Sequence, residues 1–400
     1  MKTTYLYQHT IKIFLGVIII ASIASCRKEL PQIDQPERYI SGSFSEVFDA
    51  YWTGMNNSYV FWDIDPTNWD EVHRKYKPLF AKLNLNDSTD VRKSYTYFKE
   101  MTSTLVDSHY ALQFRSAYVR DSGLINPANS RHLKNGDLHT PVGANFFYNN
   151  IPQRYLGTTT VRGVIGNTAA TQVYAIAGKI NNNILYLHFN TFKLQSTYGS
   201  AANEVVNKVL RYYFDNLKNP AGLKGLIIDV RTNGGGALDD LNFLLGPLTD
   251  KPYTFGATRS KGGMGRLEYT PWIDAKITPA KDAVAFTAPV IVLADVYSVS
   301  MSEITAMAIK ALPLGNGKFV GERTWGANGP LTSNDIYNGG QFTTGFFSLV
   351  YTSSVMLRYK DGKVYEGVGF PPDVEVKYDA AAIAAGRDPQ LEKAISLIPQ

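Results

Sequence analysis

The chain has 400 residues, of which 44% are hydrophobic and 19% are charged, and its formal net charge is +5. This length exceeds what one hydrophobic core usually supports, so we expect two or three compact parts. Two of the lysines lie in the N-terminal signal described next, and the remaining charge of about +3 is too small to indicate a nucleic-acid partner. No metal-ligand spacing is present, and we predict that no cofactor is needed.

The N-terminus has the pattern of a secretion signal. Ile13 to Ile23 form an apolar stretch that is too short to span a bilayer comfortably. Ile23-Ala24-Ser25-Cys26 matches the cleavage box of a bacterial lipoprotein, and Cys26 is the only cysteine, which excludes an intrachain disulfide. We therefore predict a signal peptide over 1–25, lipidation of Cys26, and a polar linker over 26–42. The protein would be anchored in the bacterial cell envelope, facing the periplasm or the exterior.

Residues 43–112 are predicted to form a helical cap. Apolar residues recur at helical spacing from Phe44 to Trp52, and again over an amphipathic stretch that ends near Leu105. The segment Leu105-Val106-Asp107-Ser108-His109-Tyr110 follows directly. A histidine at a helix end is usually a cap or a hydrogen-bonded partner, but histidine is also the usual base for a serine near neutral pH.

Residues 113–180 are predicted to form a small β-rich middle segment. Short β-like runs, such as Ala144–Tyr148 and Thr159–Val164, alternate there with turns rich in Asn, Gly and Pro.

Residues 181–400 are predicted to form an α/β core. The β-branched and apolar runs Ile184–Phe189, Gly225–Val230 and Pro289–Ala294 favour buried strands. The second run leads into Asn233-Gly234-Gly235-Gly236, where missing side chains let backbone amides approach a ligand closely. No Gly-Lys-Ser/Thr follows to indicate a nucleotide site.

Ser300 lies between the third strand and the helix-like stretch Ile304–Lys310. Backbone amides at a helix start lack internal partners, so an oxyanion that forms beside them is stabilised without reorganisation. The position therefore suits a nucleophile. Serines before a helix are more often caps and turn residues, and that alternative applies to Ser298, Ser300 and Ser302.

Four short segments in this order resemble the tail-specific, or C-terminal processing, serine peptidase family. They are Asp229–Gly236, Ser300 with Glu303, Val320-Gly321-Glu322-Arg323-Thr324-Trp325-Gly326, and Glu366–Asp373. The resemblance covers residues 184–378 well and implies a core like the ClpP and crotonase fold. Many relatives insert a PDZ domain in the region of residues 113–180, but we find no glycine-rich carboxylate loop there and predict none.

The resemblance points to the branch that is similar to the core of tricorn protease. The bacterial processing enzymes pair their serine with a lysine at the position that is Ala327 here, which excludes that dyad. Lys310 and Lys318 are poorly placed as bases. The tricorn-like branch uses a histidine preceded by a serine far upstream, and Ser108-His109 matches that pattern, with His188 as the main competitor.

The resemblance implies the remaining roles. Ser300 would be the nucleophile, His109 the general base, and Ser108 and Glu366 the groups that orient or polarise the histidine. The amides of Gly235 and Met301 would hold the oxyanion. Glu303 is expected to be mainly structural, and Asp229 and Arg231 are expected to hold the glycine turn in shape.

We therefore predict a serine endopeptidase that acts on extended or partly unfolded polypeptides outside the cytoplasm, in an oligomeric state that the sequence does not specify. The competing hypothesis is a catalytically inactive family member that binds peptides or other ligands in the same cleft. Acyl-CoA chemistry on a crotonase-like core is a weaker third hypothesis, because a secreted protein is removed from that substrate.

Overall fold

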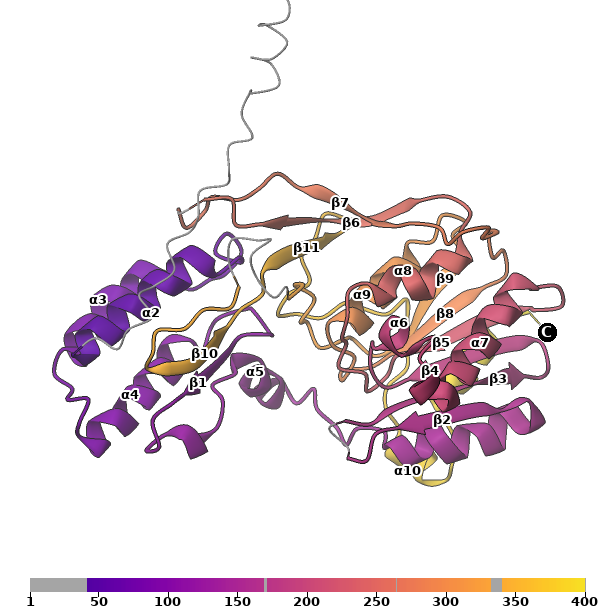
Figure 1. Ribbon diagram of the computed structural model, residues 1–400, viewed down its shortest axis with the longest axis horizontal. Coiled ribbons are helices and arrows are strands. Elements are labelled where there is room, and N and C mark those ends of the chain that lie inside the picture. The colour runs from indigo at the N-terminus through magenta and orange to yellow at the C-terminus, as the bar shows by residue number, and fades with distance from the viewer. Residues whose placement is uncertain (1–41, 169–170, 264, 332–339, 400) are drawn as a thin grey trace, which may run out of the picture.

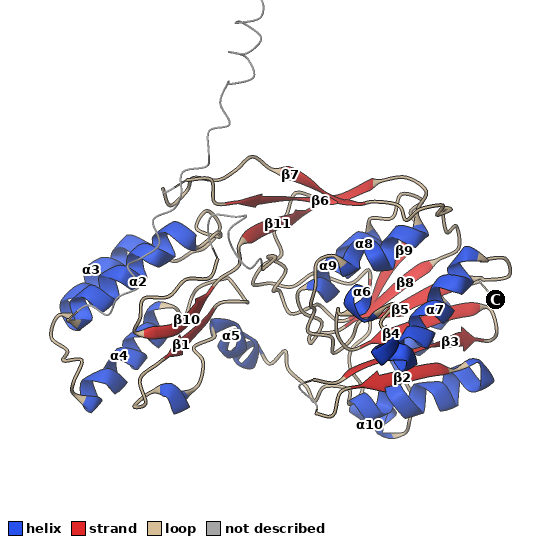
Figure 2. Ribbon diagram, viewed as in Figure 1, coloured by secondary structure: helices blue, strands red, loops and turns tan. Residues whose placement is uncertain are grey.

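The chain folds into a mixed α/β structure in which a helical part and a sheet-centred part are joined by a long β-arm (Figures 1 and 2). The computed structural model describes residues 42–399 except 169–170, 264 and 332–339. The predicted signal peptide, Cys26 and most of the linker lie outside these residues. In the described part of the chain, no helix has the length and apolar character needed to cross a membrane.

The helical part is built around an aromatic core. Its helices are α2 (Phe44–Ser58), α3 (Trp69–Phe80), α4 (Ser88–Met101) and α5 (Pro127–Asn135). They pack beside a two-stranded antiparallel sheet of β1 (Ala111–Phe114) and β10 (Phe347–Tyr351). The helices predicted over 43–105 are confirmed. The expected domain boundary at residue 112 does not separate two parts of the structure, because β10, which pairs with β1, comes from the C-terminal half of the chain.

The sheet-centred part contains a seven-stranded sheet with the order β12-β9-β8-β5-β4-β3-β2. Neighbouring strands pair in parallel from β12 to β4, and β3 and β2 are added antiparallel. The strands are β2 (Val161–Ile165), β3 (Val173–Ile180), β4 (Ile184–Phe189), β5 (Gly225–Asp229), β8 (Val290–Ala294), β9 (Gly317–Gly321) and β12 (Val374–Glu375). The predicted strands at 184–189, 225–229 and 290–294 are confirmed.

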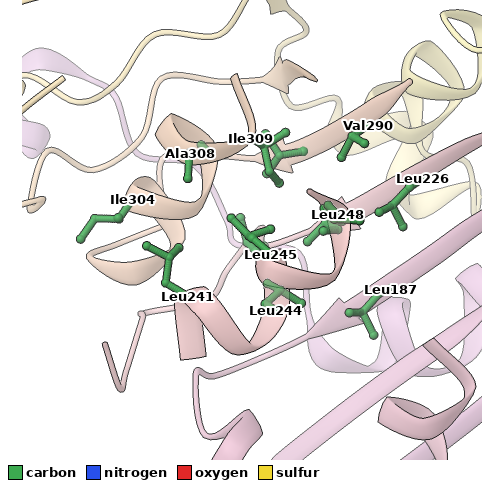
Figure 3. Close-up of a cluster of buried hydrophobic side chains, with 14 of the residues drawn as sticks. Leu187, Leu226, Leu241, Leu244, Leu245, Leu248, Val290, Ile304, Ala308 and Ile309 are labelled. Atoms are coloured by element: carbon green, nitrogen blue, oxygen red, sulfur yellow. The ribbon is translucent and has the colours of Figure 1, made fainter. Parts of the chain in front are cut away.

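Both faces of this sheet are covered, which explains its nearly continuous apolar strands. One face packs against α6 (Leu194–Thr197), α7 (Glu204–Lys218), α8 (Asp240–Leu245) and α9 (Met301–Lys310). Ile304, Ala308 and Ile309 of α9 lie near leucines of α8 (Figure 3). This packing fixes the helix that begins directly after Ser300. The other face packs against residues 142–156 and α11 (Pro389–Ser396), and α10 (Ala380–Ala384) adds the partly buried Ile383.

The middle segment differs from the expectation. Ala144–Tyr148 was predicted to be β-like, but it enters two short π-helical segments, Phe146–Asn150 and Pro152–Leu156. The prediction was wrong because Phe146, Phe147 and Ile151 bury on the sheet face together, and that tertiary packing overrides the strand preference of aromatic residues. The strands of the middle segment, β2 and β3, extend the main sheet and form no separate unit.

The β-arm is a three-stranded sheet with the order β11-β6-β7. Its strands are β6 (Tyr253–Ser260), β7 (Ile273–Ile277) and β11 (Val355–Tyr359). Arg266, from the loop between β6 and β7, contacts Asp70 of α3 through two hydrogen bonds of 2.9 and 2.6 Å. Arg259 pairs with Asp63. The arm therefore ties the sheet-centred part to the helical part along the edge that Figure 1 shows at the top.

Candidate functional site

Ser300 lies at the turn between β8 and α9, as the sequence predicts. Its backbone has φ 58° and ψ −115°, in the positive-φ region that non-glycine residues rarely adopt. Its amide donates a 3.1 Å hydrogen bond to the Glu303 carboxylate. Ser298 and Ser302 donate their hydroxyls to the carbonyls of Val230 and Asn233, so both are buried and structural. Ser300 alone of the three serines keeps a strained, half-buried position.

The glycine turn lies directly against Ser300. A Cβ at Gly235 would come within 2.8 Å of the Ser300 Cβ and 3.0 Å of the Met301 nitrogen, and Gly235 has φ +93°. Only glycine fits this close approach at that backbone conformation. The Gly235 amide donates 2.8 Å to the side chain of Asn233, so this conformation does not offer it to a ligand. This observation departs from the donor role expected for Gly235.

Glu303 joins the turn that carries Ser300 to a second loop. Its buried carboxylate accepts hydrogen bonds from Thr324 Oγ1 at 2.6 Å and from the amides of Gly326 and Ala327 at 2.7 Å each. Burial raises the pKa of Glu303, and these donors oppose that shift. The geometry agrees with the structural role that the sequence suggests for Glu303.

Glu366 accepts hydrogen bonds from the next residues of the same loop and from the segment that carries His109. Its Oε2 accepts from the amides of Asn328 and Gly329 at 2.9 and 2.8 Å, and its Oε1 accepts from the Ser108 amide at 2.8 Å. Burial raises the pKa of Glu366 well above its usual range, and the nearby charge of Asp107 raises it further. Two carboxylates, Glu303 and Glu366, thus hold one loop from both sides.

His109 is half-buried beside two carboxylates. One donor atom of its ring and one oxygen each of Asp107 and Glu366 all lie within 4.8 Å of one another. The His109 Nδ1 atom is buried and has no hydrogen-bond partner, and burial lowers the pKa of His109 to about 4. Burial raises the pKa of Asp107 to about 6. The structure therefore brings His109 and Glu366 together, as the resemblance implies.

The segment around His109 is fixed by long-range contacts. Asp107 accepts from the Ser353 amide at 2.7 Å and from the Ser353 hydroxyl at 2.9 Å. Arg131 of α5 donates 2.7 Å to the Ser108 hydroxyl and also contacts the carbonyls of Leu105 and Val106. Ser108 thus meets Glu366 through its backbone amide, while its hydroxyl faces Arg131 and not the histidine.

Ser300 and His109 are connected indirectly. In the described part of the chain no hydrogen bond joins them, but the negative charge of Glu303 is close enough to Glu366 to raise the Glu366 pKa. The loop 324–329 is bonded to both carboxylates. The turn that carries Ser300 and the segment that carries His109 are therefore linked through one buried network.

The lysine alternatives do not reach this network. Ala327 is fully buried with its amide on Glu303, so no side chain at this position supplies a base. Lys310 pairs with Asp373 at 2.7 Å, near the far end of α9. Lys318 lies on β9, and no interaction places it beside Ser300.

The other described histidines have structural surroundings. His188 is buried on β4, stacked on Phe147 with ring centroids 3.9 Å apart, and its Nδ1 contacts the Asp229 carbonyl at 3.0 Å. His139 contacts Glu322 at 2.8 Å. Arg231 pairs with both Asp229 and Asp388 in full burial, which holds the start of the glycine turn in the expected way.

Sequence reasoning missed two members of the site, Asp107 and Arg131. Asp107 stands two residues before His109, so its proximity could have been noted. Arg131 lies in a polar helix with no motif around it, and its contact with Ser108 arises only in three dimensions.

Comparisons with known proteins identify relatives of the central part of the chain. Residues 183–376 match the model of peptidase family S41. Tricorn protease from Thermoplasma acidophilum is 28% identical over 181 residues, which are 45% of this chain and 14% of that protein. Tricorn protease homolog 1 from Streptomyces coelicolor is 32% identical over 186 residues, which are 46% of this chain and 15% of that protein. The chain thus spans about one seventh of the length of these curated relatives.

A candidate peptidase from Parabacteroides merdae has a solved structure that superposes with a TM-score of 0.64 at 21% identity, covering 89% of this chain and 97% of that one. This likeness extends the shared fold beyond residues 183–376 to the N-terminal helices. Residues 183–376 therefore match peptidase family S41, a family of serine hydrolases, and the mixed α/β fold is shared with the solved Parabacteroides merdae structure.

Proposed function

We propose that this protein is a serine endopeptidase that cleaves extended or partly unfolded polypeptides outside the cytoplasm, with Ser300 as nucleophile and His109 as general base. The observation that carries this proposal is the shared loop 324–329, which bonds Glu303 behind Ser300 and Glu366 beside His109. Because one loop is bonded to both carboxylates, the fold itself sets the position of Ser300 relative to His109.

The chemistry follows from these positions. Ser300 Oγ attacks the peptide carbonyl carbon while His109 takes the hydroxyl proton, and His109 then gives that proton to the departing amine. Water repeats the sequence on the acyl-enzyme and releases the second product. Glu366 favours the imidazolium that forms during each step, and it holds the Ser108 amide so that the histidine stays oriented.

The oxyanion is assigned to backbone amides. Met301 is the first residue of α9, where amides have no partner within the helix, and the helix dipole favours negative charge there. Because the Gly235 amide is donated to Asn233, the second donor is assigned to Gly234 or Gly236, the exposed glycines on either side. Gly235 then contributes by its missing side chain, which leaves room for the substrate carbonyl.

Catalysis needs a hydrogen bond between the His109 ring and the Ser300 hydroxyl, and such bonds in unliganded sites are often long and tighten only with substrate. The helical part carries His109, the sheet-centred part carries Ser300, and loop 324–329 is bonded to the carboxylates beside both. A substrate of extended conformation suits this arrangement, because its backbone can pair along a strand while one carbonyl meets Ser300.

The broader assignments from the sequence are also part of this proposal. A lipid anchor on Cys26 would hold the protein in the cell envelope, facing the periplasm or the exterior, after removal of residues 1–25 and with 26–42 as a linker. We retain the ClpP- and crotonase-like description for the core. We revise the proposed division of the chain so that β10 joins the helical cap and β2 and β3 join the core.

Digestion of a loosely folded protein such as casein by the purified full-length chain tests the proposal. We expect cleavage by the wild type and by Ser196→Ala, an exposed control, and none by Ser300→Ala. If wild type and Ser300→Ala are both folded and inert across several unfolded substrates, the inactive binding protein becomes the better account, with Ala327 marking the lost lysine.

A further inference from the structure

We infer that Asp107, His109 and Glu366 form a site for a divalent transition-metal ion, with Zn²⁺ as the best match, and that this ion blocks the candidate general base. The consequence for cleavage rests on the proposed function, whereas the binding site itself rests only on the three side chains. The donor set is one imidazole nitrogen and two carboxylate oxygens, a combination that suits Zn²⁺ better than Mg²⁺ or Ca²⁺.

The spacing is close to what an ion needs. The three donor atoms lie within 4.8 Å of one another. Donors on a tetrahedral Zn²⁺ lie about 3.4 Å apart, given bonds near 2.1 Å. Side-chain rotations that move the donor atoms by about 1 Å would therefore bring all three within bonding distance of one ion. A fourth coordination position would remain for water.

Each donor has capacity for a metal bond. Oε1 of Glu366 accepts one described hydrogen bond, from Ser108, and Oδ2 of Asp107 accepts one, from Ser353. A carboxylate oxygen has two lone pairs, so each keeps one free. His109 Nδ1 is buried without a partner, which is an uncommon state for a polar atom and one that coordination would satisfy.

The electrostatics also favour a cation. Asp107 and Glu366 are buried close to one another, so holding both as anions without a neighbouring cation is costly. Arg131 is the cation that contacts the 105–109 segment among the described residues, and it bonds Ser108 but neither carboxylate. A bound Zn²⁺ would stabilise both anions.

The site is also accessible from one side. Asp107 and Glu366 are buried, but His109 is half-buried. An ion would therefore enter past the histidine, and once bound it would occupy the ring that has to accept the Ser300 proton. Inhibition would be reversible, because a chelator can remove the ion by the same path.

The binding test uses full-length Ser300→Ala protein, freed of metal by a chelator and titrated with ZnCl₂ alone by calorimetry. This variant lacks the proposed nucleophile, so the result is independent of peptidase activity. We expect one Zn²⁺ per chain at this site with a micromolar or tighter Kd, and no binding of MgCl₂. Adding His109→Ala should weaken binding by about 100-fold or more, since loss of even an outer-shell partner commonly costs 10- to 100-fold.

Two further variants keep the test sharp. Glu366→Gln should also weaken binding, but its carboxylate holds three amides and the protein could lose its fold. His109→Ala avoids that problem because the ring makes no hydrogen bond with the described residues. His139→Ala, which removes a different histidine–carboxylate pair, should bind Zn²⁺ as well as its parent.

Undetectable binding at about 100 μM ZnCl₂, or equal binding by His109→Ala and its parent, would overturn the inference. With active wild type, cleavage should fall in ZnCl₂ and return with EDTA. An inert wild type that still binds Zn²⁺ through His109 would refute the peptidase and leave the metal site standing. An active wild type that does not bind Zn²⁺ through His109 would refute the metal site and leave the peptidase standing.

Discussion

Ser300 is positioned by the strand, turn and helix in which it lies, whereas His109 is positioned by side chains from three distant segments. The first arrangement is determined by residues that are adjacent in the sequence, from β8 to the first turn of α9. The second needs Arg131, Ser353 and Glu366 to meet around one short loop. The Ser300 side, the proposed nucleophile side, is therefore expected to tolerate changes elsewhere in the fold. The His109 side, the proposed base side, depends on how the helical part docks.

The largest expected effect comes from Glu303, which supports the nucleophile turn and the shared loop together. Glu303→Gln would replace one carboxylate oxygen by an amide that cannot accept from the donors around it. Leaving such buried groups unsatisfied should destabilise the protein by about 3–5 kcal/mol, which urea unfolding would measure. Glu204→Gln, at an exposed ion pair, should change stability by about 0.5 kcal/mol or less. Similar results for both variants would show that Glu303 supports neither side.

Gly235→Ala should act on the nucleophile side alone. The added Cβ would meet Ser300 and the Met301 amide at a positive φ, so we expect cleavage to fall by about 10²- to 10³-fold, the usual cost of losing an oxyanion donor. Gly199→Ala is the matched control, since Gly199 has φ +81° but open space around it. It tests backbone strain without the collision, and an equal loss of activity there would contradict our account.

Arg131→Gln should act on the base side alone. Without the guanidinium, Ser108 and the carbonyls of Leu105 and Val106 lose their common donor, and the His109 loop should shift. A displacement of about 1 Å can cost about a hundredfold in rate, so we expect kcat to fall up to that amount while KM and the thermal midpoint change little. Amide exchange at 106–109 should quicken.

Arg323→Gln is the control for this position, because Arg323 donates to Gly369 and not to the His109 loop. Arg131→Lys should rescue only part of the rate, since a single ammonium group cannot reproduce the planar set of donors of the guanidinium. A uniform loss of stability without a change in kcat would assign Arg131 to the fold and not to the site.

A further expected effect depends on pH and arises in the core, away from both sides of the site. Burial raises the pKa of Asp295 to about 6, and its Oδ2 has no partner. A raised carboxyl pKa contributes stability below the unfolded value near 4, and this contribution is lost as pH rises through about 6. Asp295→Asn should therefore stabilise the protein above pH 6, by about 3 kcal/mol at most, and have little effect near pH 4. Thermal unfolding at both pH values measures this, and an equal shift at both would contradict the assignment.

Much of the core could be predicted from the sequence because its signals are local. The strand before Ser300, the helix after it and the glycine turn each follow from a run of apolar residues that ends at a turn. The helical run near Phe146 could not be predicted, because its aromatic side chains turn toward a sheet face that forms from distant strands.

The site divides in the same way. The family resemblance placed Glu366 near His109, but no periodicity could have paired β1 with β10 or directed Arg131 to Ser108. The Gly235 amide was expected to be free, and only the structure shows its bond to Asn233. Contacts between residues far apart in sequence carry no local signal, and these contacts decide the geometry around His109.

The most direct test of the central claim is the rate at which a fluorophosphonate labels Ser300 in wild type and in His109→Ala, with His73→Gln, at a partly buried histidine of α3, as the control. Our account predicts labelling in wild type and the control, and a loss in His109→Ala nearly as complete as in Ser300→Ala. Labelling of His109→Ala at the wild-type rate would show that another group activates Ser300 and would contradict the account.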